Sequence, residues 1–139
     1  MIPFRVVFRP GASLYEQVVY AAKKALVSGQ LRPGDAFPSV RTLSAELKIN
    51  PNTAHKVITQ LLNEGLLEVR PGAATVVAEP RESSAAECAR LLENEVEQLV
   101  VEAMRLGMSL DEVTASVAAH WRRFEIAAPA AGKGTRKIR

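Results

Sequence analysis

The sequence lacks most of the residues on which catalytic and metal sites depend. Its 139 residues contain one cysteine, Cys88, and two histidines, His55 and His120. A single cysteine excludes an internal disulfide and fits a reducing compartment. No Cys/His cluster has the spacing of a zinc site, the eight glycines are scattered rather than gathered into a phosphate loop, and Cys88 has no base placed beside it. We therefore expect no enzyme activity, no cofactor and no metal.

Long apolar runs are missing as well. No stretch approaches the roughly 20 apolar residues that a membrane-spanning helix needs, and residues 1–11 lack the long apolar core of a signal peptide. Hydrophobic residues make up 47% of the chain and charged residues 24%, which is ordinary globular usage. We expect a cytoplasmic protein without a membrane partner, built as one modest domain with an appendage or as two very small domains.

Charge is distributed in three blocks, although the net charge is only +3. Residues 1–80 carry nine Lys or Arg against six Asp or Glu, residues 81–128 carry five against nine, and residues 129–139 carry four and no acid. A basic front suggests that contact with a polyanion belongs to residues 1–80, with the basic tail as a second candidate. The excess is small, so charge supports nucleic-acid binding without establishing it.

Residues 39–65 have the most informative pattern, because they predict two short helices joined by a tight turn. Ser39 is a residue type that caps helix N-termini, and Asn50 with Pro51 restarts a helix after a break in the pattern. One face of the second helix is apolar, at three- and four-residue spacing: Ala54, Val57, Ile58, Leu61 and Leu62. The other face is polar: Asn52, Thr53, His55, Lys56, Gln60 and Asn63. Such a helix suits the DNA major groove, although an ordinary helical core would have the same periodicity.

A short hairpin is predicted directly after this stretch. Residues 66–69 and 75–78 are strand candidates, and residues 70–74 contain the Pro and Gly of a turn. A helix-turn-helix followed at once by a hairpin with Arg70 at its tip is a winged-helix arrangement. From that tip Arg70 can reach a phosphate or the minor groove while the preceding helix occupies the major groove. The expected fold class is therefore mainly α with a small β wing.

Several motifs within residues 12–80 follow one another in order: LYEQ, SGQLRPGD, FPSVRTLSAEL, NPNT and LLNEGLLEVRPG. Together they resemble the winged helix-turn-helix of the GntR family, and NPNT with the short C-terminal part resembles its YtrA branch. The resemblance implies a transcription regulator, and in particular a repressor, that binds palindromic operators as a dimer. Carried over to this sequence, it implies DNA contacts by Ser39, Arg41, Asn52, Thr53, His55, Lys56, Arg70 and Gly72. The chemistry agrees for most of them, because Arg can be bidentate to guanine or phosphate and Asn suits adenine.

The wing tip departs from many relatives, which are more basic there. This chain has Pro71 and the neutral pair Ala73 and Ala74. A neutral tip favours an alternative function, a winged-helix module that binds another protein without specific DNA binding.

Residues 81–128 predict two helices that cannot bury their apolar stripes on each other alone. In the first, apolar residues alternate at spacings of four and three, as in a heptad seam: Ala85, Ala89, Leu92, Val96, Leu99, Ala103 and Leu106. The second is lined by Leu110, Val113, Val117, Trp121 and Phe124. Either the winged domain or a second copy of the chain must cover these stripes, and we favour a homodimer held by Leu92, Val96, Leu99, Ala103, Leu106, Val117, Trp121 and Phe124. A two-fold dimer would set two recognition helices one DNA turn apart, roughly 34–36 Å.

The expected organisation has four parts: an N-terminal strand or arm over residues 1–11, a winged helix-turn-helix over 12–80, a two-helix dimerisation segment over 81–128, and a basic tail over 129–139. The tail is expected to be disordered, because it has few residues that can pack. The expected partners are double-stranded DNA and a second copy of the chain. The sequence identifies no operator, and it leaves open whether a small-molecule effector binds.

Overall fold

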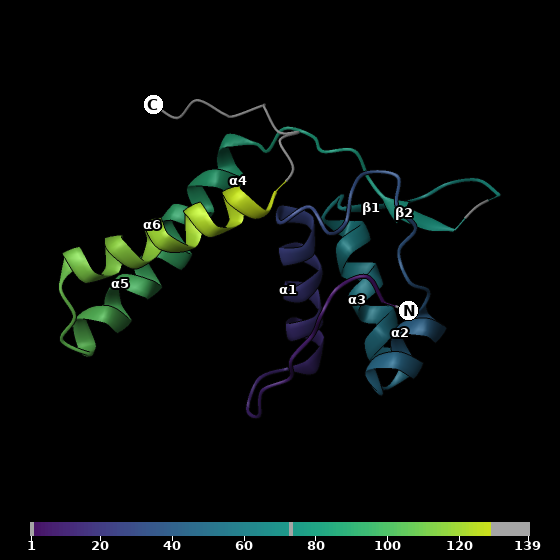
Figure 1. Ribbon diagram of the computed structural model, residues 1–139, viewed down its shortest axis with the longest axis horizontal. Helices are drawn as coiled ribbons and strands as arrows, with labels where there is room; N and C mark the ends of the chain where they lie inside the picture. Colours follow the sequence, from purple (N-terminus) through teal and green to yellow (C-terminus); the bar gives the residue numbers. More distant parts are fainter. Residues whose placement is uncertain (1, 73, 129–139) are drawn as a thin grey trace. The chain divides into compact units, whose positions relative to one another are not determined.

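The computed structural model describes residues 2–72 and 74–128, which form helices joined by loops together with one two-stranded sheet (Figure 1). The basic tail expected over residues 129–139, and Ala73 of the wing tip, lie outside the described residues. Residues 2–80 fall in one compact unit and residues 81–126 in a second. The prediction of a mainly helical fold with a small β wing is confirmed.

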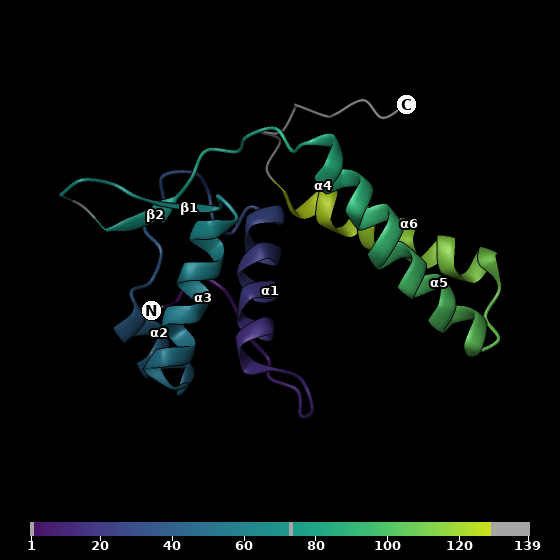
Figure 2. The same ribbon diagram turned by 180° about the vertical axis from the view of Figure 1, so that it is seen from behind.

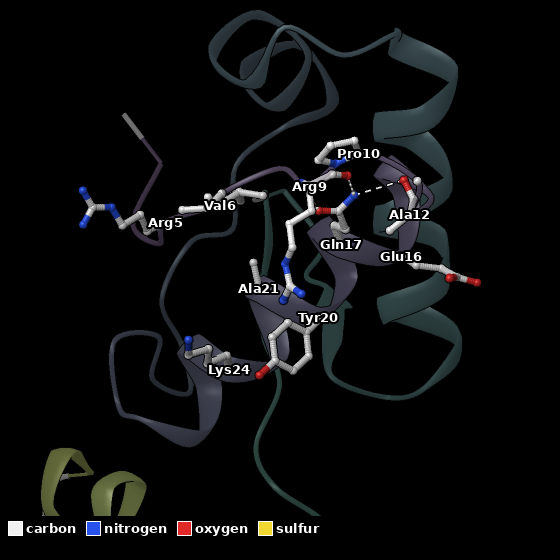
Figure 3. Close-up of a pocket in the computed structure, with 12 residues that line it drawn as sticks. Arg5, Val6, Arg9, Pro10, Ala12, Glu16, Gln17, Tyr20, Ala21 and Lys24 are labelled. Carbon is white, nitrogen blue, oxygen red and sulfur yellow. Dashed lines mark hydrogen bonds between the residues drawn. The ribbon is translucent and has the colours of Figure 1, made fainter. Parts of the chain in front are cut away.

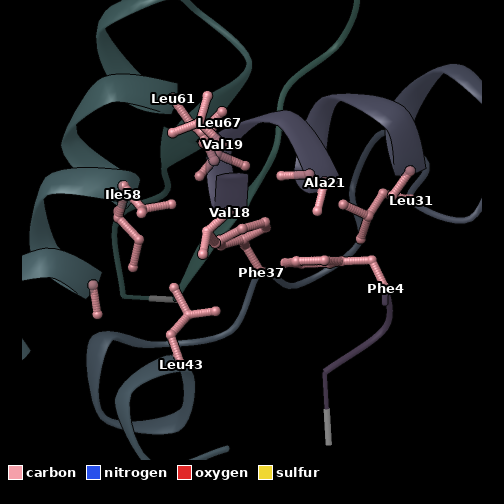
Figure 4. Close-up of a cluster of buried hydrophobic side chains, with 14 of the residues drawn as sticks. Phe4, Val18, Val19, Ala21, Leu31, Phe37, Leu43, Ile58, Leu61 and Leu67 are labelled. Carbon is pink, nitrogen blue, oxygen red and sulfur yellow. The ribbon is translucent and has the colours of Figure 1, made fainter. Parts of the chain in front are cut away.

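The first unit is built on three helices and a hairpin. In chain order these are α1 (Leu14–Val27), α2 (Val40–Leu47), α3 (Pro51–Asn63), β1 (Leu67–Val69) and β2 (Thr75–Val77). Each helix begins after a capping side chain, because Ser13, Ser39 and Asn50 accept hydrogen bonds from N–H groups of the first turn. Apolar residues at helical spacing then pack α3 against both α1 and α2. The largest fully buried side chains are Leu43, Leu61, Val18, Val57 and Val77, and Figure 4 shows much of this core.

Residues 2–11 form an extended arm, and the alternative that they form a strand is wrong. Alternate side chains of the arm turn inward onto the core, as they would in a strand that covers a core. The arm needs no neighbouring strand, because side chains satisfy part of its backbone. The N–H of Ile2 donates to Glu46 Oε1 at 3.0 Å, and the N–H of Arg9 donates to Gln17 Oε1 at 2.8 Å.

The wing is a short antiparallel hairpin in which Leu67 of β1 lies opposite Val77 of β2. The loop before α2 also bonds to β2. The N–H of Phe37 donates to the carbonyl of Thr75 at 2.9 Å, and the N–H of Val77 donates to the carbonyl of Asp35 at 2.8 Å. The wing is thus tied to the loop that leads into α2 as well as to the end of α3.

The second unit is a helical hairpin. Its first half consists of α4 (Ala85–Arg90), a π-helical turn η1 (Leu91–Glu95) and α5 (Val96–Arg105), and α6 (Leu110–Ala127) returns beside it (Figures 1 and 2). Both halves begin with a capping box, formed by Ser84 with Glu87 and by Ser109 with Glu112. The first half is not a uniform α-helix, because the N–H of Val96 bonds to the carbonyl of Leu91, five residues back. A π-turn holds more residues than an α-turn, so α4 is rotated out of the register that a strict heptad repeat assumes.

This hairpin leaves most of its large apolar side chains exposed. Ala103 is the single buried residue between positions 81 and 126, and Phe124 is half-buried. The other residues expected at a dimer contact are exposed: Leu92, Val96, Leu99, Leu106, Val117 and Trp121. Val100 and Met104, which were not among the expected contacts, are exposed as well. Apolar surface of this extent usually marks an interaction site.

Candidate nucleic-acid interface

Helix α3 is held with one face inside the first unit. The Asn50 side chain accepts a hydrogen bond from the N–H of Asn52 at 2.7 Å, and Pro51 occupies the first helical position, where no N–H is needed. The buried face consists of Ala54, Val57, Ile58 and Leu61. Because rotation of α3 would expose this face, the residues opposite to it are held toward solvent.

The outer face of α3 carries the residues that the sequence predicted to read DNA. Asn52, His55 and Lys56 are exposed, and Thr53 is half-buried. Within the described residues, the side chains of Asn52 and His55 make no hydrogen bond. Their donors and acceptors are therefore available to a ligand, and groups of this kind can bond to base edges in a major groove.

One exposed residue of this face was missed by the sequence reasoning. Thr59 is exposed and lies one helical turn beyond His55. Residues four apart are neighbours on a helix surface, so the spacing from His55 could have identified it. Asn63, one turn further on, is also exposed.

Two polar residues of α3 face α1. The Nζ of Lys56 lies 4.8 Å from the centroid of the Tyr15 ring, and the Tyr15 hydroxyl donates to Gln60 Oε1 at 2.9 Å. Gln60, which the sequence assigned to the outer face, is half-buried here. Lys56 remains exposed, so it lies at the border between the reading face and α1.

An ion pair strengthens the contact between α1 and α3. The Nζ of Lys23 lies 2.9 Å from Glu64 Oε1, and the Gln60 amide also donates to Glu64. Partial burial raises the pKa of Glu64, but the hydrogen bonds from Lys23 and Gln60 outweigh that effect, and the net pKa lies below its ordinary value. Helix α3 is thus fixed on α1 by polar bonds as well as by apolar packing.

Ser39 and Arg41 lie at the start of α2, the helix packed against α3. The Ser39 hydroxyl accepts from the N–H of Thr42 at 3.1 Å and donates to Thr42 Oγ1 at 3.2 Å, so its donor is used within the cap. Arg41 is exposed and has no ion-pair or hydrogen-bond partner in the described part of the chain. The guanidinium of Arg41 is therefore available to an anion.

Arg70 and Gly72 lie in the turn of the wing. The Nε of Arg70 donates to Glu68 Oε2 at 3.1 Å, which neutralises part of the arginine charge within the wing. Gly72 has a φ of 71°, in the left-handed region that favours glycine, and nothing lies within 4 Å of where a Cβ would stand. The backbone of Gly72 is therefore open to close approach by a duplex.

Residues 2–72 and 74–128 contain neither a metal-binding cluster nor a membrane-spanning helix. No group of three or more His, Cys, Asp or Glu side chains is placed there to hold a metal ion. None of the helices in these ranges is long and apolar enough to cross a membrane.

The sequence matches one protein family and several named relatives. Residues 14–77 match the family described as bacterial regulatory proteins, gntR family. The HTH-type transcriptional repressor YtrA of Bacillus subtilis (strain 168) is 30% identical over 106 residues, which cover 76% of this chain and 82% of that protein. The uncharacterized HTH-type transcriptional regulator YhcF of the same strain is 30% identical over 106 residues, covering 76% and 88%. Both alignments are longer than the family match.

Solved structures share the fold. A transcriptional antiterminator from Listeria monocytogenes EGD-e superposes with a TM-score of 0.78 at 21% identity, covering 94% of this chain and 97% of that one. A GntR family transcriptional regulator from Listeria monocytogenes has a TM-score of 0.58 at 24% identity, with coverage of 81% and 98%. At such identities the likeness shows the fold alone.

Proposed function

This chain belongs to the gntR family of bacterial regulatory proteins, in its YtrA-like branch, and from that membership we propose that it represses transcription as a homodimer bound to a two-fold symmetric operator. It is a DNA-binding transcription regulator. Repression is favoured over activation because the Bacillus subtilis relative YtrA is named a transcriptional repressor. The proposed place of action is the cytoplasm, where a bacterial operator lies.

The observation that carries the proposal is the division of α3 into a buried apolar face and an exposed polar face. Asn52 and His55 present unused hydrogen-bonding groups on the exposed face. Side chains of this kind read base edges when their helix lies in the major groove. We assign base reading to Asn52 and His55, with Thr53 and Thr59 beside them.

Contacts with the DNA backbone are assigned to groups around this face. Arg41 of α2 stands at the groove edge, where a guanidinium can take a phosphate or a guanine. Lys56 and Arg70 supply further cations, and Gly72 allows close approach of the wing backbone. Arg70 is expected to contribute least, because it shares its charge with Glu68. Phosphate contacts set the register of the reading helix but carry no sequence information themselves.

The second unit supplies the surface for dimerisation. Leu92 is 62% exposed and Trp121 is 67% exposed in the single chain. Removal of apolar surface from water stabilises a complex by roughly 25 cal/mol per Å², so a second copy with the same stripe is a favourable partner. We assign the contact to Leu92, Val96, Leu99, Leu106, Val117, Trp121 and Phe124. Ala103 was expected at the dimer contact as well, but it is already buried within one chain. It therefore packs the helical hairpin itself.

The experiment that tests the proposal is selection of bound sequences from a random DNA pool with the full chain. We expect an inverted repeat whose half-sites lie about 10–10.5 base pairs apart, or a multiple of that spacing, from centre to centre. Selection with the Asn52→Ala variant should lose information at specific positions within each half-site. Enrichment of a single unrepeated half-site would contradict the dimer on its operator.

The alternative function predicts a different outcome of the same experiment. A winged-helix module that binds another protein would enrich no sequence, while its solution mass still corresponded to a dimer. Sedimentation of the sample used for selection therefore separates the two functions.

A further inference from the structure

A cavity of about 640 Å³ lies between the N-terminal arm and α1 (Figure 3). Gln17 fastens the arm to α1 beside it. Its side-chain amide bonds to the backbone of Arg9 at 2.8 and 3.2 Å and to the carbonyl of Ala12 at 3.1 Å. Its wall includes Val6, Arg9, Pro10, Tyr20, Ala21 and Lys24.

The cavity lies on a flank of α1 that is turned away from α3. Tyr15 and Lys23 are the residues of α1 that bond to α3. At 3.6 residues per turn, Gln17, Ala21 and Lys24 lie on nearly the opposite side of the helix. A duplex held by α3 has no need of this flank, so DNA reading does not account for the cavity.

Arg9 and Lys24 bring positive charge to the cavity, whose lining also includes Arg5 and one acid, Glu16. Neither the Arg9 nor the Lys24 side chain has an ion pair or a hydrogen bond among the residues that the structure describes. Figure 3 shows the Arg9 guanidinium beside Tyr20 and Ala21, whereas the carboxylate of Glu16, the acid among the lining residues, is directed away from it. Like charges at one site repel, and an anion placed between them would relieve that repulsion.

The remaining wall is apolar. Val6, Pro10 and Ala21 contribute aliphatic surface, and the Tyr20 ring is 59% exposed. An exposed ring offers a flat surface for stacking, and ligand sites commonly combine apolar walls with a few polar groups in volumes of about 300–1,000 Å³. We propose that the cavity binds a small organic anion, with Arg9 and Lys24 on its carboxylate or phosphate group and with Tyr20 and Val6 against its body.

Such a ligand would restrain the arm. Phe4 of the arm is buried in the core, and the N–H of Ile2 donates to Glu46 of α2. A ligand that bridges Arg9 of the arm and Lys24 of α1 therefore acts on a segment that continues to the helix-turn-helix. We expect the effect of binding to extend along the arm as far as Ile2.

Titration of the full chain with phenyl phosphate, followed by amide NMR, is the direct test. We expect saturable shifts at the amides of Arg9, Gln17, Tyr20 and Lys24, with a smaller shift at Ile2. Benzyl alcohol, which has a ring but no charge, should cause no saturable shift, and inorganic phosphate should bind about tenfold more weakly because it lacks the body. Absence of shifts with phenyl phosphate, or equal shifts with benzyl alcohol, would overturn the proposal.

Charge-removing variants test the assigned cations. Arg9→Gln and Lys24→Gln should each weaken phenyl phosphate binding by about tenfold, because each removes a charge-assisted contact. Arg32→Gln is the matched control, because Arg32 is an exposed cation of the same unit that does not line the cavity, and it should change affinity by less than about twofold. Equal losses in all three variants would mean general electrostatic attraction and would overturn the site.

A competition experiment with DNA separates this site from the proposed function. The titration itself contains no DNA, so its result does not depend on operator binding. Displacement of phenyl phosphate by a random-sequence duplex would assign Arg9 and Lys24 to the DNA backbone and overturn the small-ligand site. Simultaneous binding of both would support it.

Discussion

The ammonium group of Lys56 lies over the ring of Tyr15, with its Nζ 4.8 Å from the ring centroid. The same tyrosine donates its hydroxyl to Gln60 at 2.9 Å, so one side chain of α1 engages two successive turns of α3. This position directs Lys56 along the edge of the reading helix nearest to α1. When a helix lies in the major groove its edges face the sugar-phosphate backbone, and the compact charge of a lysine suits a phosphate.

Lys56→Gln is therefore expected to weaken binding to operator and random duplexes by similar factors. The slope of the logarithm of the DNA-binding constant K against the logarithm of the salt concentration should become less negative by about one unit for each protomer. The wild-type slope is expected near about −5 if the dimer neutralises six phosphates. Fluorescence anisotropy over a salt series measures both quantities, and Tyr15→Leu, which keeps the lysine, should preserve the slope. A loss confined to the operator would instead assign Lys56 to base edges.

The sequence predicted best the structural features that depend on residues close together in the chain. Ser39 and Asn50 were identified as caps because a cap and its first turn are adjacent, and both side chains make the expected bonds. Gln60 was assigned to solvent, yet its partner Tyr15 lies 45 residues earlier. No pattern within α3 could reveal a contact at that separation.

The sequence also predicted which side chains are buried better than it predicted which segments of the protein cover them. The alternation in residues 2–11 is real, but any extended segment lying on a core alternates in the same way, so the pattern could not distinguish an arm from a strand. In the second unit the seven-residue spacing could not reveal the π-turn at Leu91–Glu95. Nor could it show that Ala103 is buried by its own chain. The base-reading residues remain predictions, because exposure alone does not identify a ligand.

Asn52→Ala is expected to cost about 1–3 kcal/mol in binding to the operator, the range for loss of a specific base contact. Binding to random DNA should change little, because Asn52 carries no charge. Asn63→Ala is the matched control, since Asn63 is also exposed but lies at the far end of α3. Competition binding with the two duplexes measures the ratio. An equal loss on both duplexes would place Asn52 on the backbone.

Leu99→Asp is expected to convert the dimer to a monomer at micromolar concentration. Leu99 is 46% exposed in the single chain, and a carboxylate at that position would have to be buried without a partner in the dimer contact. Operator affinity should fall with the dimer, because the second half-site would no longer be bound within one molecule. Sedimentation velocity provides the mass, and Gln98→Asp, which adds the same charge to an exposed polar position, is the control. A Leu99→Asp protein that stayed dimeric would remove this residue from the contact.

Glu64→Gln tests the ion pair that fixes α3 on α1. Burial raises the pKa of Glu64, and the bonds from Lys23 and Gln60 lower it further than burial raises it, so the folded state favours the ionised form. The carboxylate therefore stabilises the fold above about pH 4, and this contribution is lost as the pH falls through the lowered pKa. At pH 7 the variant should lose about 0.5–1 kcal/mol of unfolding free energy, the range for a largely solvated pair.

Urea unfolding at a series of pH values measures how that loss depends on protonation. The difference between wild type and Glu64→Gln should shrink toward zero as the pH falls through the lowered pKa of Glu64, because the wild-type carboxylate is then protonated as well. Glu79→Gln is the control, because Glu79 is exposed, lies outside the helices and strands and forms no ion pair among the described residues, so its substitution should change stability little. If the Glu64→Gln difference instead stayed constant over the whole acid range in which the protein remains folded, its cause would be altered packing at the end of α3 rather than the charge on the carboxylate.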